Sequence, residues 1–179
     1  MTNHKPIIVE VGGSAQHGKD TFASLVKQYA EENGKRCVIT HYADYLKFVA
    51  KQFWGWDGKK DEKGRTLLQQ VGTEKIRFFD ENFWVESVER ILPFLDADIV
   101  LIADCRFVNE VEYFRKMGYT TIYVKVIREN FDNGLTPEQK RHPSETALNN
   151  YEPDCTAYNS SSLENLLEVA EVFYDCWLR

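Results

Sequence analysis

Residues 9–21 read VEVGGSAQHGKDT and join an apolar run, residues 7–11, to an amphipathic segment that begins at Lys19. Gly13 and the pair Gly18-Lys19 have the spacing of a phosphate-binding loop, with four residues between the two glycines. Glycines let the backbone point its N–H groups inward, the following helix presents the positive end of its dipole, and a lysine ammonium reaches the outer phosphates. The stretch therefore predicts a strand, a loop that cradles the phosphates of a nucleotide, and a helix.

Asp20 departs from the usual pattern of such loops, in which a Ser or Thr follows the lysine and meets Mg²⁺ through its hydroxyl. The hydroxyl comes one residue later, at Thr21. Carboxylates suit Mg²⁺ well, so Asp20, directly or through water, and Thr21 are both candidates for the metal contact. A glycine-rich turn without a ligand is the alternative, and the strand before the loop and the helix after it argue against it.

The composition predicts one domain over residues 1–179 with a sizeable core, since 43% of the residues are hydrophobic. The net charge of −6 argues against polymeric nucleic acid as a partner. The cysteines are scattered without a C-x-x-C pair, which indicates neither zinc nor a disulfide framework and fits a reducing cytoplasm. No apolar run approaches the ~20 residues of a membrane span, so we expect a soluble, cytoplasmic protein without a membrane partner.

Hydrophobic periodicity and turn signals predict strands that alternate with helices. The predicted strands are residues 7–11, 36–42, 99–103, 120–127 and, as the weakest, 154–158. The predicted helices begin at Lys19, at a cap on Asp44, at Arg65 with an interruption or bend at Gly72-Thr73, at a cap on Asn82, at Val108, at a cap on Ser144, and at a capping box of Ser161 with Glu164. Residues 59–65 are expected to be an exposed, mobile linker and residues 129–143 a flexible flap. This order predicts an α/β fold, a P-loop kinase-like three-layer α/β/α architecture with a mostly parallel five-stranded sheet.

The strand at residues 99–103 is a continuous apolar run, typical of a strand buried on both faces, and Asp104-Cys105-Arg106 follow it. Ligands bind beyond the carboxyl ends of strands in such sheets, so Asp104 and Arg106 should lie beside the phosphate loop. A phosphate loop alone does not separate a kinase from a hydrolase. Several arginines are placed to meet a second phosphorylated ligand, which favours a small-molecule kinase: Arg65, Arg77, Arg106 and Arg128.

At these motifs the sequence resembles the deoxynucleoside monophosphate kinases of tailed bacteriophages, and the likeness spans most of the chain. Asp20 is the family's usual residue at its position, whereas His17 stands where some members have a serine. The motifs that carry the likeness are Gly18-Lys19-Asp20-Thr21, Arg65-x-x-x-Gln69-x-x-Gly72-Thr73, Phe83-Trp84-Val85, Asp104-x-Arg106 with Glu110, the strand that closes at Arg128, and His142-x-x-Glu145.

The resemblance implies phosphorylation of deoxynucleoside monophosphates to diphosphates, with ATP and Mg²⁺, in the cytoplasm of a phage host. It implies that ATP is held by Gly13, Gly18, Lys19, Asp20 and Thr21, and that the metal is met by Asp20, Thr21 or Asp104. It implies an acceptor pocket formed by Arg65, Gln69, Thr73, Trp84, Arg106 and Glu110. The residues expected to act in the transfer are Lys19, Asp20, Asp104, Arg106 and Arg128.

The residues alone leave several alternatives open. A polar stripe such as Arg65, Gln69 and Thr73 is equally explained as the solvated side of a helix, and Trp84 as a core aromatic. His142 and Glu145 read as a local turn and helix start. Another small-molecule kinase, acting on a metabolite such as dephospho-coenzyme A, and a non-catalytic ATP-binding regulatory module remain alternative functions. The accepted bases, the preference for deoxyribose and dimerisation stay open.

Lys19→Ala should nearly abolish phosphoryl transfer and leave the fold intact, because the motif assigns the lysine's charge to phosphates and not to packing. Steady-state turnover and the melting temperature of the variant measure the two effects separately. Near wild-type turnover of Lys19→Ala would contradict the kinase assignment.

Overall fold

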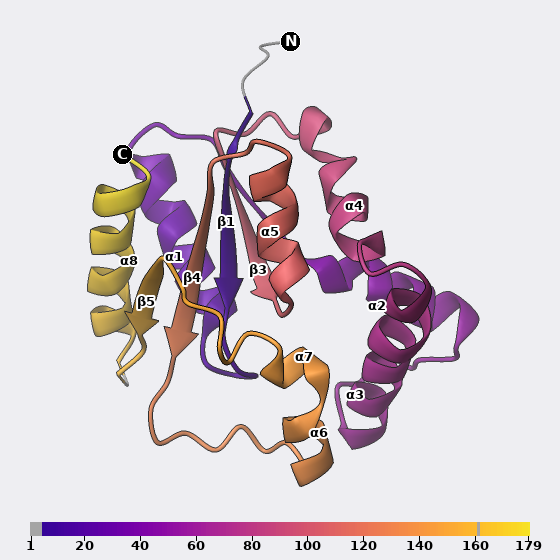
Figure 1. Cartoon of the computed structure of the whole chain (residues 1–179). Coiled ribbons are helices and arrows are strands. Elements are labelled where there is room, and N and C mark those ends of the chain that lie inside the picture. The colour runs from indigo at the N-terminus through magenta and orange to yellow at the C-terminus, as the bar shows by residue number, and fades with distance from the viewer. Residues whose placement is uncertain (1–4, 161) are drawn as a thin grey trace.

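Strand β1 (Ile7–Gly12) lies in the middle of a five-stranded sheet in the computed structural model, which describes residues 5–160 and 162–179 (Figure 1). The strand order is β2-β3-β1-β4-β5, and all four neighbouring pairs are parallel. The other strands are β2 (Cys37–Thr40), β3 (Ile99–Cys105), β4 (Thr121–Ile127) and β5 (Cys155–Tyr158). The carboxyl ends of all five strands therefore meet at one edge of the sheet.

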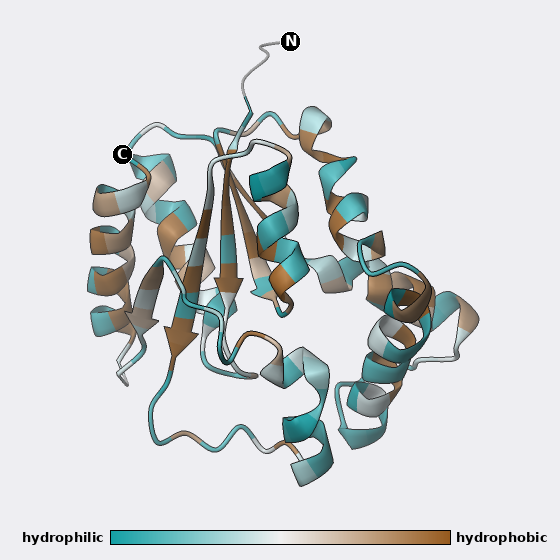
Figure 2. Ribbon diagram, in the orientation of Figure 1, coloured by the Kyte–Doolittle hydropathy of each residue, from teal (hydrophilic) through white to brown (hydrophobic). Residues whose placement is uncertain are grey.

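Helices cover both faces of the sheet, because successive residues of β1 point to opposite sides. Val9 and Val11 pack under α1 (Lys19–Glu32) and α8 (Leu163–Trp177). Ile8 packs on the other face, in a cluster with residues of three further helices: α2 (Tyr42–Phe53), α4 (Phe83–Glu89) and α5 (Val108–Lys116). Figure 2 shows the hydrophobic residues gathered in the strands and on the helix faces turned to them. The three-layer α/β/α fold with its parallel sheet is thus confirmed.

Most of the remaining helical segments lie at the carboxyl edge of the sheet or beside it (Figure 1). Helix α3 (Glu62–Gln69) continues directly into a π-helical segment, Gln70–Arg77, and a short 3₁₀ helix spans Leu92–Phe94. Two short helices, α6 (Pro137–Arg141) and α7 (Pro143–Thr146), lie below the strand ends and face α3 (Figure 1). Gln139 of α6 donates hydrogen bonds to Glu62 O and Thr66 Oγ1 of α3, so the two segments touch.

Two predicted helix starts on this side were wrong. Helix α2 begins after His41, and Asp44 lies in its first turn, because β2 already ends at Thr40, opposite Ile102 of β3. Helix α3 begins at Glu62, within the predicted linker, because the Asp61 side chain accepts a hydrogen bond from Gly64 N at 2.9 Å.

The predicted interruption at Gly72-Thr73 is a widening of the helix and not a break. The chain stays helical through Gln70–Arg77 with π-type geometry. Gly72 is buried there, and a Cβ at this position would lie 2.8 Å from the Leu46 side chain. Its carbonyl accepts a hydrogen bond from Trp84 Nε1 at 3.0 Å, so the wide turn is held by α4.

Differences at the remaining boundaries also have local causes. Strand β3 runs on to Cys105. The predicted flap contains α6, which Thr136 and Gln139 close with a capping box, and α7 is capped by His142 and not by Ser144. The predicted cap Ser161 lies outside the described residues, and α8 is capped by Ser162, which accepts from Asn165 N.

No helix among the described residues is long and apolar enough to cross a membrane.

Glu10 is a fully buried carboxyl group in the middle of β1, on the face that α2 covers. The Tyr42 hydroxyl donates a hydrogen bond to its Oε1 at 2.6 Å. Burial raises the pKa of Glu10 well above its ordinary value of 4.5, which the Tyr42 hydrogen bond only partly offsets. The folded chain therefore retains a proton on Glu10 at pH values where the unfolded chain has lost it.

Glu10→Gln should make the stability of the protein less dependent on pH. A folded-state pKa above the unfolded one means that Glu10 lowers the free energy of unfolding progressively as the pH rises above about 4.5, by at most ~1.4 kcal/mol per pH unit. Glutamine keeps the shape and the acceptor for Tyr42 but cannot ionise. Urea unfolding of both proteins from pH 5 to pH 8 measures this, and parallel pH profiles would contradict a protonated Glu10.

Candidate active site

The phosphate loop lies between β1 and α1, at the carboxyl edge of the sheet. Gly13 has φ +131°, and a Cβ there would lie 2.3 Å from Val126 O, so only glycine fits. Gly18, at φ +96°, is the N-cap of α1 and offers no side-chain cap. The N–H groups of the first turn of α1 are therefore available to an anion, as the motif requires.

Lys19 folds back over this loop. Its Nζ donates hydrogen bonds to Gly13 O and Ser14 O, both at 2.8 Å, and the residue is 8% exposed. Burial lowers the pKa of Lys19 to about 8, and the charge of Arg106 acts in the same direction. The ammonium group is thus held inside the loop, close enough to Arg106 for the two charges to interact.

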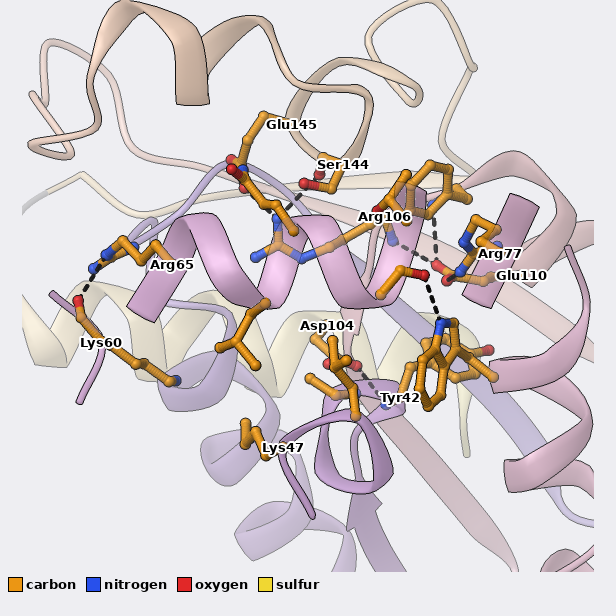
Figure 3. A pocket seen from close by; sticks show the side chains of 18 of the residues that line it. Tyr42, Lys47, Lys60, Arg65, Arg77, Asp104, Arg106, Glu110, Ser144 and Glu145 are labelled. Atoms are coloured by element: carbon orange, nitrogen blue, oxygen red, sulfur yellow. Dashed lines mark hydrogen bonds and ion pairs between the residues drawn. The ribbon is translucent and has the colours of Figure 1, made fainter. Parts of the chain in front are cut away.

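A cavity opens beside the loop at the carboxyl end of β3 (Figure 3). Its walls come from α2, α3, the π-helical segment, α4, α5 and α7. All six residues expected to bind the acceptor line this cavity, together with Asp104: Arg65, Gln69, Thr73, Trp84, Arg106 and Glu110. The polar stripe of α3 and the π-helical segment therefore faces the cavity, while Trp84 is 4% exposed and belongs both to the cavity wall and to the core.

Arg106 reaches into the cavity below α7 (Figure 3). Its Nη1 donates hydrogen bonds to Ser144 O at 3.0 Å and to Glu145 Oε1. Its backbone N–H donates to Glu110 Oε2 at 2.7 Å. The guanidinium is therefore held at one nitrogen by α7, and the backbone is held by α5.

Glu110 is a buried carboxylate that organises the turn between β3 and α5. It accepts hydrogen bonds from the backbone N–H groups of Arg106 and Phe107 and from Arg77 Nη2 at 2.5 Å. Burial raises the pKa of Glu110, while the charge of Arg77 opposes this shift. The Arg77 guanidinium also lies 4.0 Å from the centre of the Phe107 ring. Both carboxylate oxygens of Glu110 thus accept hydrogen bonds from described residues, and its predicted contact with an acceptor stays a prediction.

Asp104 joins β3 to the start of α2. Its two carboxylate oxygens accept hydrogen bonds from Tyr42 N at 2.8 Å and Ala43 N at 2.9 Å. A carboxylate at a helix N-terminus is stabilised by the helix dipole. Asp104 therefore positions α2 on the cavity wall, and its predicted role beside the metal stays a prediction.

Besides the loop residues Gly13, Gly18 and Lys19, three predicted residues lie outside this cavity. Asp20 is exposed and its Oδ1 pairs with His41 Nε2 at 2.8 Å, an interaction that raises the pKa of His41. Thr21 is exposed on α1. Arg128 donates its backbone N–H to His17 Nδ1, and its guanidinium lies 4.2 Å from the centre of the Phe131 ring. Among the described residues, no group of three or more His, Cys, Asp and Glu side chains forms a ready metal site.

A second cavity is lined by the loop residues Ser14 and His17 and by seven residues between Phe131 and Asn149. Leu135 and Glu145 line both cavities. Glu145 Oε2 also accepts a hydrogen bond from the loop at Ala15 N, at 3.3 Å, so its carboxylate connects the loop to Arg106.

Glu145 and the α2 residues of the cavity were not among the predicted site residues. Tyr42, Ala43 and Lys47 follow the end of β2, so the rule that placed Asp104 would also have placed them. Glu145 had no such signal beyond the His142-x-x-Glu145 motif.

The fold is similar to that of solved P-loop kinases. A structure of the Mycobacterium tuberculosis APS kinase CysC in complex with AMPPNP and APS matches with a TM-score of 0.54 at 12% identity, over 96% of this chain and 97% of that one. A Cys556Ala mutant of the same enzyme matches with a TM-score of 0.52 at 14% identity, over 96% of each chain. At this identity the likeness establishes the fold alone.

The family follows from the sequence comparisons. The family model described as deoxynucleotide monophosphate kinase matches residues 30–169. A deoxynucleotide monophosphate kinase of Escherichia phage RB69 is 32% identical over 111 residues, which are 60% of this chain and 43% of the relative. The matched region thus spans less than half the length of that relative. The chain belongs to the deoxynucleotide monophosphate kinase family.

Proposed function

We propose that the protein transfers the terminal phosphoryl group of ATP to deoxynucleoside monophosphates and so forms diphosphates. The family membership supports this reaction. The observation that carries it is the placement of Arg106, which enters a cavity lined by every residue expected to bind the acceptor, while Glu145 links this arginine to the phosphate loop. This arrangement supports a donor phosphate at the loop beside an acceptor phosphate at Arg106.

The residues divide between the two substrates. The N–H groups of the loop and the Lys19 ammonium are placed to hold the phosphates of ATP. The Arg106 guanidinium is placed to hold the phosphate of the acceptor, whose base and sugar would contact the stripe formed by Arg65, Gln69 and Thr73. Phosphoryl transfer depends mainly on such positioning and on neutralised charge, and both are available here.

The residues present also fit Mg²⁺. Magnesium is usually held by one or two carboxylates together with substrate phosphates, and it keeps several waters. Asp20, at the start of α1, has Oδ2 free of hydrogen bonds to any described residue, and Asp104 and Thr21 are the other candidates. Bound Mg²⁺ would neutralise charge on the transferred phosphoryl group.

The function is tested by measuring ADP release in a coupled assay with each deoxynucleoside monophosphate and its ribose counterpart. Turnover should appear with at least one deoxynucleoside monophosphate. Turnover with dephospho-coenzyme A as acceptor, and with none of the nucleoside monophosphates, would favour a dephospho-coenzyme A kinase. ATP binding without turnover on any acceptor would favour a regulatory module.

Asp20→Ala should raise the Mg²⁺ concentration needed for half-maximal turnover, because a carboxylate at the start of α1 would be lost from the metal or its water shell. Asp20→Ser should restore part of the activity by supplying the hydroxyl usual in such loops. A magnesium titration of each variant measures this. If Asp20→Ala titrates like the wild type, Thr21 becomes the better candidate.

Arg106→Lys should raise the KM for the monophosphate and lower kcat, with kcat/KM reduced by about tenfold or more, since a lysine cannot reproduce a bidentate grip on phosphate. The affinity for ATP without acceptor should change little. Arg141→Lys, on the exposed face of α6, is the matched control and should behave like the wild type. Unchanged acceptor kinetics in Arg106→Lys would rule out the proposed acceptor site.

A further inference from the structure

Arg106 meets α7 with only one of its three guanidinium nitrogens. Nη1 carries two hydrogens, and it donates to Ser144 O and to Glu145 Oε1. Nε and Nη2 have no hydrogen bond to any residue that the structure describes. Together they form the edge of the guanidinium that binds two oxygens of a phosphate side by side. The α7 contact therefore orients the arginine and leaves its phosphate-binding edge free.

Glu145 is a buried carboxylate, since its side chain is 8% exposed. Its two oxygens serve two different parts of the site: Oε1 pairs with Arg106, and Oε2 accepts from Ala15 N in the middle of the phosphate loop. It also lies where the two cavities adjoin. One side chain thus fixes the arginine proposed for the acceptor relative to the loop proposed for the donor.

We propose that Glu145 is a positioning residue that sets the acceptor phosphate, through Arg106, in line with the phosphate loop. This inference rests on the proposed function and assigns a role to a residue outside the loop and outside the strand ends. In-line transfer is sensitive to small displacements, and a shift of about 1 Å can cost roughly a hundredfold in rate.

The other carboxylates near Arg106 indicate how the arginine would respond to the removal of Glu145. Asp104 and Glu110 are the other carboxylates whose charges act on Arg106. Both are already engaged with backbone N–H groups, at the start of α2 and in the turn after β3. Neither carboxylate contacts the phosphate loop. Without Glu145 the arginine would keep its charge but would lose the side chain that links it to the donor site.

The test is a double-mutant cycle of Glu145→Gln with Arg106→Lys. Glu145→Gln should lower kcat/KM for the monophosphate by about tenfold to a hundredfold, while the Kd of ATP without acceptor becomes no weaker. In the Arg106→Lys background the same change should have less than about a twofold effect, because Glu145 acts through the arginine. Glu138→Gln, an exposed carboxylate on α6, is the matched control and should leave the kinetics unchanged.

Three results would overturn the proposal. An equal loss of kcat/KM in both backgrounds would show that Glu145 does not act through Arg106. An unchanged or increased kcat/KM with tighter ATP binding would show that the carboxylate only occupies the place of a phosphate. A lowered melting temperature with equally weakened ATP and monophosphate binding would show a structural role.

Turnover and binding assays on the wild-type protein distinguish a failure of this proposal from a failure of the proposed function. If the wild-type protein has no turnover with any deoxynucleoside monophosphate, the proposed function fails, and Glu145 is judged by calorimetric binding of each monophosphate alone. Glu145→Gln should then weaken that binding by about tenfold in the wild-type background and not in Arg106→Lys. A wild-type protein that binds none of the monophosphates would overturn both.

Discussion

The parallel pairing of β1 with β3 and β4 is the constraint on which the rest of the structure depends. Gly12, the last residue of β1, lies opposite Cys105 of β3 and Lys125 of β4. The loop after β1 and Arg106 after β3 therefore follow strands that end at the same edge of the sheet and at the same level along the strand direction. A parallel sheet needs helices on both faces, and these helices wall the cavity that results.

Buried and half-buried carboxylates connect the parts of this edge. Asp104 attaches the start of α2, Glu110 holds the turn after β3 together with Arg77, and Glu145 connects α7 to the loop and to Arg106. A buried carboxylate is stable only where N–H groups or cations surround it. Each of these three has such partners, so the same contacts that satisfy the charge also fix the geometry of the site.

Local signals were reliable where the local chain decides the conformation. The spacing of Gly13, Gly18 and Lys19 is such a signal, because φ values near +131° and +96° require glycine whatever lies nearby. The start of α2 shows the opposite case. Asp44 is a good capping residue, yet the helix starts after His41, because pairing of β2 with β3 ends at Thr40. The widened turn at Gly72 likewise depends on Leu46 and Trp84, which come from other helices.

The sequence by itself determined the order of the strands and of the main helices, and the phosphate loop, because period, spacing and strand ends are written in neighbouring residues. The set of polar residues that line the cavity was predicted only through the family resemblance. The tertiary structure alone decided that Asp104 is committed to α2, that Arg128 lies on Phe131 outside the cavity, and that Glu145 joins Ala15 to Arg106. The partners of Glu145 lie 130 and 39 residues away along the chain. Contacts over such separations form only when the sheet brings its strand ends together, so no local pattern could encode them.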